Sequence, residues 1–139
     1  TTLRDIFEMR IVLEVGLSYV IFAKITPDDL AVLEQIVDQG EKLGMRYNGH
    51  FHRKLHEISG NKSIVEFQQV MNPVIEYVVS QNKSMFEMRE NELAAHGRLV
   101  TDRNLLELLK TGNEAGYREA IVHYFDRYSD YFGYTKKDA

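Results

Sequence analysis

The sequence has little of several residue types, and each shortage narrows the possibilities. It contains no cysteine among 139 residues, which excludes disulfide bonds and thiolate metal sites. Proline occurs only twice, and no stretch alternates apolar and polar residues as a strand does, so the pattern predicts helices throughout. The longest apolar stretch, 11–25, is interrupted by Glu14 and Lys24 and is therefore not predicted to span a membrane.

Positive charge is also scarce. The chain carries 17 lysines and arginines against 21 acidic residues, a formal net charge of −4. Nucleic-acid binding needs clustered basic residues, so we expect no direct DNA contact from this chain. The length predicts one domain over 1–139, and without a signal peptide we expect a cytoplasmic location. The start at Thr1-Thr2, without an initiator methionine, indicates a piece of a longer protein.

Apolar periodicity predicts about six helices that pack as an antiparallel all-α bundle. They span about 3–25, 27–44, 47–59, 62–79, 99–110 and 114–132. The polar stretch 80–96 is compatible with a loop or with a helical continuation. Residues 133–139 form a polar tail that we expect to be frayed.

Five polar residues fall on or beside the apolar faces of these helices: Arg10, Asn48, His52, Asp102 and Tyr124. Buried polar groups need hydrogen-bond partners. One central cavity that holds a ligand, an ion or waters would satisfy all five. This convergence predicts a central polar cavity.

Each of these residues also has a simpler explanation. His52 could be a core histidine with a local partner, and the Tyr124 hydroxyl could reach a backbone group. Asp102 could cap the helix that follows it. Arg10 could pair only with Glu14, one turn further along its helix. The separate and the shared explanations both remain open at this point.

His52 and His56 lie four residues apart and could imitate a two-histidine metal pair. His56, however, turns away from the apolar seam of its helix, which Phe51, Leu55 and Ile58 form. We therefore predict that His56 lies on the surface.

Three motifs match one known pattern in order and spacing. Arg10 with Leu13-Glu14 is similar to an Arg-x-x-Leu-Glu signature in a first helix. The segment from Phe51-His52 to Ser59-Gly60-Asn61 matches an Asp-x-x-Phe-His…Ser-Gly-Asn segment, and 112–121 matches a closing helix pair. Together they resemble the FCD (FadR C-terminal domain) family, the effector-binding domain of GntR-type bacterial transcription regulators.

This resemblance implies an antiparallel helical bundle with a central cavity, often with a divalent metal on one aspartate and three histidines. A small carboxylate effector commonly binds at that metal. The four ligand positions fall on Asn48, His52, Asp102 and Tyr124, of which only His52 keeps the family's residue type. The resemblance also implies a homodimer and a winged helix-turn-helix DNA reader, N-terminal to and absent from this chain.

The substitutions at these positions weaken the case for a metal. Zinc and nickel favour imidazole, and two of three histidines are missing. Asparagine is a neutral ligand, and a tyrosine hydroxyl is hard to deprotonate near neutral pH. We therefore predict no cofactor, or a weakly bound divalent metal on His52, Asp102 and Asn48.

The leading interpretation is a ligand-sensing and dimerisation domain of a transcription regulator. Its effector would be a small metabolite such as an organic acid, with Arg10 as the charge partner of the carboxylate. One alternative is an interaction module without a pocket, in which Arg10 and Asp102 pair. Another is an enzyme that uses His52 and Asp102, but no catalytic motif supports it, so we predict that the chain is not an enzyme.

Overall fold

The computed structural model describes residues 2–129, and within that range the chain is helical without strands. Seven α-helices and one short 3-10 helix follow one another: α1 (Leu3–Lys24), α2 (Pro27–Lys42), α3 (Gly49–Ile58), α4 (Lys62–Gln81), α5 (Lys83–Ala95), α6 (Asp102–Lys110), α7 (Glu114–Tyr124) and η1 (Phe125–Tyr128). The predicted all-α fold is confirmed.

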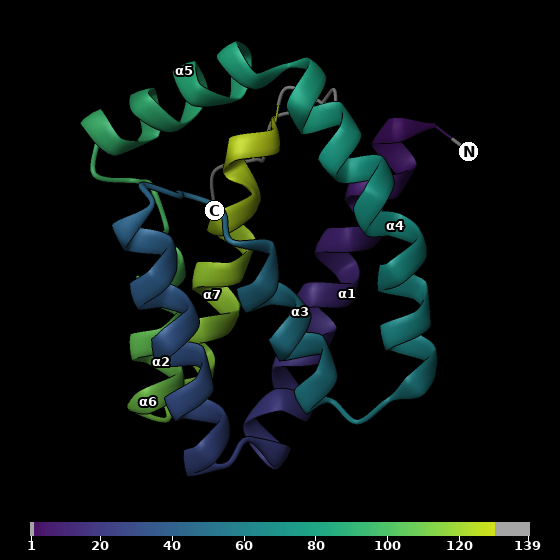
Figure 1. Cartoon of the computed structure of the whole chain (residues 1–139), viewed down its shortest axis with the longest axis vertical. Coiled ribbons are helices and arrows are strands. Elements are labelled where there is room, and N and C mark those ends of the chain that lie inside the picture. The colour runs from purple at the N-terminus through teal and green to yellow at the C-terminus, as the bar shows by residue number, and fades with distance from the viewer. Residues whose placement is uncertain (1, 130–139) are drawn as a thin grey trace.

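The additional helix is α5, which resolves the uncertainty over 80–96. It begins at Lys83, one residue after α4 ends, and no side chain caps its start. Only Phe86, Glu90 and Leu93 are buried along it, which explains why its sequence shows little apolar periodicity. In Figure 1 it lies across one end of the bundle, while the other helices run up and down.

Helix starts follow their capping residues. Thr26 accepts a hydrogen bond from the backbone N–H of Asp29, whose side chain accepts one from the Thr26 N–H, and Pro27 occupies the first turn. Gly60 follows the end of α3 with a φ of +64°, a left-handed conformation that favours glycine. The start of α2 and the end of α3 lie within one residue of the predicted positions, 27 and 59.

One continuous apolar core joins the helices. Helix α1 packs against α7 and α3, α2 packs against α6 and α3, and α6 packs against α7. The buried side chains come from all of these elements and include Leu17, Leu33, Leu55, Leu105 and Ile121. Because α3 contacts α1, α2 and α4, side chains on its inner face lie near the middle of the fold (Figure 1).

The last predicted helix, 114–132, is shorter than expected. Helix α7 ends at Tyr124, and the chain tightens into a 3-10 turn from Phe125 to Tyr128. The predicted end near Phe132 and the predicted tail at 133–139 lie outside the described residues. Leu99 was assigned to the preceding helix, but α6 begins only at Asp102.

Arg127 in this 3-10 turn ties several segments to the bundle. Its guanidinium donates to a Glu90 carboxylate oxygen at 2.7 Å and to the carbonyls of Arg46 and Val100 at 3.2 and 2.5 Å. The side chain is almost fully buried. It therefore fixes α5 and the two loops that precede α3 and α6.

We predict that Arg127→Met destabilises the domain by about 3–5 kcal/mol, because it leaves a largely buried carboxylate and two carbonyls without their donor. Urea unfolding followed by circular dichroism measures this. Arg118→Met, which removes an exposed i,i+4 pair with Glu114, is the control and should cost under about 1 kcal/mol. Equal losses in the two variants would contradict the anchoring role.

Candidate functional site

Four of the five polar residues predicted to point inward, all except Arg10, meet in one cluster, and His52 is at its centre. Its Nε2 atom lies 3.1 Å from Oδ1 of Asp102 and 3.0 Å from the Tyr124 hydroxyl. These three side chains come from α3, α6 and α7, and all are buried. Nδ1 of His52 is buried without a hydrogen-bond partner.

The local sequence explains why His52 is buried. Phe51, Leu55 and Ile58 form the inner face of α3, as predicted, and His52 borders that face. Tyr47, just before the helix, stacks on the imidazole with ring centroids 5.1 Å apart and planes 9° from parallel. The imidazole is thus held by a ring on its face and by polar groups at its edge.

Asn48 caps the N-terminus of α3. Its side-chain oxygen accepts from the His50 N–H at 3.1 Å, and its amide nitrogen donates to the Ile36 carbonyl at 3.0 Å. Its backbone N–H donates to Oδ2 of Asp102 at 3.0 Å. A Cβ at Gly40 would lie 2.7 Å from the amide nitrogen, so glycine makes room for this side chain.

Tyr124 was predicted to point inward from the last helix. The structure agrees: Tyr124 is buried, whereas His123 is exposed and pairs with Asp126 at 3.2 Å. Burial raises the pKa of the Tyr124 hydroxyl well above its usual value, so the hydroxyl stays protonated at neutral pH. The guanidinium carbon of Arg127 lies 4.0 Å from the centre of its ring.

Two of the simpler explanations fail. Thr101, not Asp102, caps α6, since its hydroxyl accepts the N–H of Asn104. The Tyr124 hydroxyl reaches His52 and not a backbone group. Arg10 does contact Glu14, at 3.4 Å, but it also donates to the Tyr47 hydroxyl at 2.9 Å.

The prediction that His56 lies on the surface is wrong. His56 is buried, and its Nε2 atom lies 2.7 Å from a carboxylate oxygen of Glu14. Glu14 stands in the buried stripe of α1 beside Arg10, which is the one signal that could have indicated an internal partner. Arg10, Glu14 and His56 thus form a second buried polar cluster beside the first.

The charge of Glu14 is stabilised by its neighbours. Burial alone would raise the pKa of this carboxyl, but His56 and Arg10 outweigh burial and lower it to about 2. The other carboxylate oxygen of Glu14 has no hydrogen-bond partner, nor has the buried hydroxyl of Tyr117 on α7. Sequence reasoning missed Glu14, His56 and Tyr117 as members of the polar interior.

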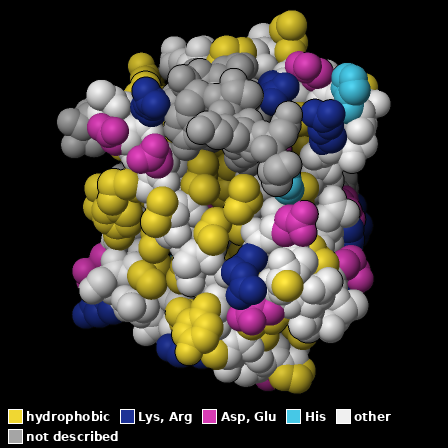
Figure 2. Space-filling model, turned by 180° about the vertical axis from the view of Figure 1, so that it is seen from behind, with side chains coloured by type: hydrophobic (Ala, Val, Ile, Leu, Met, Phe, Trp, Pro, Cys, Tyr) yellow, Lys and Arg dark blue, Asp and Glu magenta, His cyan; other side chains and the backbone are white. Residues whose placement is uncertain are grey.

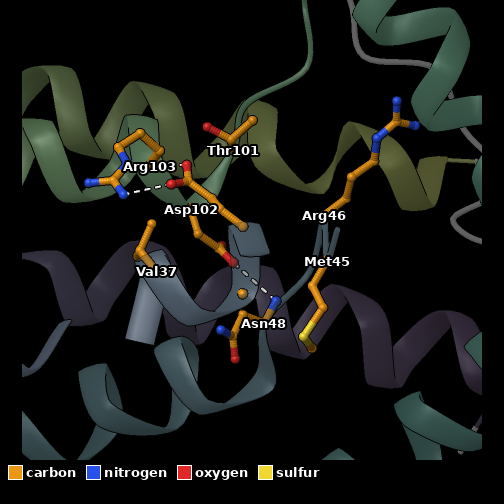
Figure 3. A pocket seen from close by; sticks show the side chains of 9 residues that line it. Val37, Met45, Arg46, Asn48, Thr101, Asp102 and Arg103 are labelled. Carbon is orange, nitrogen blue, oxygen red and sulfur yellow. Dashed lines mark hydrogen bonds and ion pairs between the residues drawn. The ribbon is translucent and has the colours of Figure 1, made fainter. Parts of the chain in front are cut away.

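A pocket of about 230 Å³ opens against the first cluster. Asn48 and Asp102 line it together with Thr101, Arg46 and Arg103, between α2, the loop before α3 and the start of α6. Figure 3 shows the Asp102 carboxylate directed at the Asn48 backbone nitrogen, while Arg46 extends to the opposite side from Arg103. The central polar cavity expected from the sequence stays a prediction.

The residues present do not fit a transition-metal centre. His52 is the only imidazole in the first cluster, both ends of the Asn48 amide are engaged, and Tyr124 stays protonated. Among residues 2–129, no group of three or more acidic or histidine side chains could hold a metal ion. We therefore assign no role to a metal here.

The family model of the FCD domain matches residues 5–127, nearly the whole chain. The chain therefore belongs to the FCD family, the effector-binding regulatory domains of GntR-type regulators. No curated protein and no solved structure shows a significant match to the chain. Within the part that the structure describes, no helix is long and apolar enough to cross a membrane.

The pKa of Glu14 predicts acid sensitivity. Its carboxyl has a pKa of about 2 in the folded state against an ordinary glutamate value of 4.5 in the unfolded chain, so the unfolded state binds more protons between these values. The stabilisation, roughly 3 kcal/mol, is present above pH 4.5 and is lost as the pH falls toward 2. Urea unfolding at a series of pH values measures it.

Glu14→Gln should remove this part of the pH dependence and flatten the stability curve between pH 4.5 and 2. The exposed Glu119→Gln is the matched control and should follow the parent curve. If the Glu14→Gln curve keeps the same slope as the parent, the carboxyl is not the group that titrates.

Proposed function

We propose that this chain is the effector-binding and dimerisation domain of a GntR-type transcription regulator, in the cytoplasm, and that its effector is a small organic acid. In this proposal DNA is bound by a winged helix-turn-helix domain elsewhere in the regulator. The family match supports the regulatory role. The acidic balance of the chain agrees with a sensor that does not itself touch DNA.

The single observation that carries the proposal is the pocket against the buried cluster of His52, Asp102 and Tyr124. A pocket of about 230 Å³ has room for a small metabolite but not for a large cofactor. Asn48 and Asp102 supply polar groups to its lining, and His52 contacts Asp102 behind them. The Nδ1 atom of His52 has no hydrogen-bond partner. Such convergence beside an opening is typical of binding sites.

Two guanidinium groups favour an acid as the effector, in a pocket that Glu41 and Asp102 also line. Arg46 and Arg103 both line the pocket, and guanidinium groups grip carboxylates in two places. Arg103 is now held by Glu34, Asp38 and Glu41 of α2, at 2.6–3.1 Å for its closest contacts. Arg10, the charge partner predicted from the sequence, points to Glu14 and Tyr47, and its contact with an effector stays a prediction.

The pocket walls connect to the rest of the fold through Arg127. Its guanidinium holds the carbonyls of Arg46 and Val100, on the two loops that border the pocket, and Glu90 on α5. A ligand that draws these loops together would therefore shift α5 and η1. Differential affinity for two such arrangements is what a ligand-controlled switch requires.

For dimerisation we propose the outer face of α4. Phe67, Val70, Val74 and Tyr77 recur every three or four residues and are all exposed. This spacing is typical of a helix that packs along a second helix, and an identical helix in a second copy fits it symmetrically. Seen from behind in Figure 2, hydrophobic side chains gather at the edge where α4 runs and across the middle of that face.

We predict that one of acetate, lactate, malate or citrate raises the melting temperature of the domain without being consumed. A ligand at 100 times its Kd adds about 2.7 kcal/mol of stability. His52→Gln should abolish the response, whereas the exposed His123→Gln should retain it. Thermal shift together with product analysis tests this prediction. Turnover of an acid would favour an enzyme. A melting temperature that none of the acids raises would contradict an acid effector.

We predict that Val70→Lys converts the dimer to a monomer, because a buried unpaired lysine is costly at a helix–helix contact. Size-exclusion chromatography with light scattering should give twice the 16.2 kDa chain mass for the parent and one chain mass for the variant. Met88→Lys on α5 is the control, since both residues are 71% exposed. A dimer that survives Val70→Lys would exclude this face.

A further inference from the structure

The carboxylate of Asp102 on α6 meets two partners at the beginning of α3. The backbone N–H of Asn48 donates to Oδ2 at 3.0 Å, and Nε2 of His52 lies 3.1 Å from Oδ1. The Tyr124 hydroxyl lies 3.0 Å from the same imidazole nitrogen. Each carboxylate oxygen thus has its own partner, one from the start of α3 and one from its first turn.

These donors are set in place independently of Asp102. Asn48 is fixed by its hydrogen bonds to Ile36 and His50, and the imidazole of His52 is fixed by the stacked ring of Tyr47. The Tyr124 ring is held from the other side by the guanidinium of Arg127. Removal of the Asp102 carboxylate would therefore leave the donors in place without an acceptor.

Asp102 and Asn48 line the 230 Å³ pocket, and the imidazole of His52 contacts the Asp102 carboxylate behind that lining. The partners of this carboxylate are a backbone N–H and an imidazole, not a guanidinium or an ammonium group. This is the donor chemistry that binds a single carboxylate group by hydrogen bonds. An external carboxylate of one or two carbons has the size of the side chain that occupies the position.

We propose that the Asn48 N–H and the His52 imidazole, which the Tyr124 hydroxyl contacts, form a carboxylate-binding cradle, and that Asp102 is its tethered occupant. The chain supplies its own acid group to this position. An external acid in the pocket therefore meets a negative floor and must bind through the arginines at the mouth or displace Asp102. When Asp102 is shortened, the cradle accepts a free monocarboxylate.

This inference is independent of the proposed function, since it concerns what the cradle binds and not which metabolite regulates the protein. If formate raises the melting temperature of the shortened variant while no acid raises that of the parent, the cradle is supported and the acid effector is not. If the parent responds to an acid but the variant is not rescued, the effector proposal stands and the cradle fails.

The test is chemical rescue of Asp102→Ala by sodium formate and sodium acetate, followed by thermal unfolding. The variant should melt roughly 5–15 °C below the parent, because buried donors lose their acceptor. Formate at about 1–200 mM should recover at least half of that loss in a saturable way, as expected for ligand binding to the folded state. Sodium chloride at equal ionic strength is the salt control.

Three further variants decide between specific rescue and a general salt effect. Asp102→Asn keeps the side-chain volume and should show no saturable response to formate. Asp28→Ala, in the exposed first turn of α2, should respond to formate no more than to chloride. Asp102→Ser should be rescued as Asp102→Ala is, and it replaces the alanine variant if that chain does not fold. Formate that acts no better than chloride on either shortened variant would overturn the proposal.

Discussion

The contact of one imidazole nitrogen with two partners organises this domain. Nε2 of His52 touches Asp102 at 3.1 Å and Tyr124 at 3.0 Å, so one atom joins α3 to α6 and α7. A buried polar atom without a partner is costly, and the three helices must keep their mutual positions to keep these contacts. The pocket beside Asp102 is lined by residues of α2, the loop before α3 and the start of α6.

Two buried guanidinium groups lie near this centre, and each connects a different set of elements. Arg10 connects α1 to Tyr47 and, through Glu14, to His56 on α3. Arg127 secures the pocket side through the loops and α5. The two guanidinium groups therefore connect α1, α5 and the loops before α3 and α6 to the buried polar interior.

The helices and most of the inward-pointing polar residues follow from the periodicity of the sequence. The partners of the buried polar side chains depend on contacts between residues far apart in the chain. Helical periodicity placed His52 and Tyr124 inside, because both lie among the apolar residues of their own helices. His56 was predicted outside because it turns away from the apolar seam of its helix, and its partner Glu14 lies 42 residues away in the sequence. Tyr47 stands in a turn without periodicity, so its stacking on His52 could not be predicted. Helix α5 shares few apolar contacts and was for that reason ambiguous.

The account depends most on the coupling between His52 and Asp102. A double-mutant cycle with His52→Gln, Asp102→Asn and the double variant, each unfolded in urea at neutral pH, measures that coupling directly. We expect an interaction energy of about 1.5–3 kcal/mol, as for a hydrogen bond to a charged group. Losses that add to within about 0.5 kcal/mol would mean that the two side chains are independent, which would contradict the account.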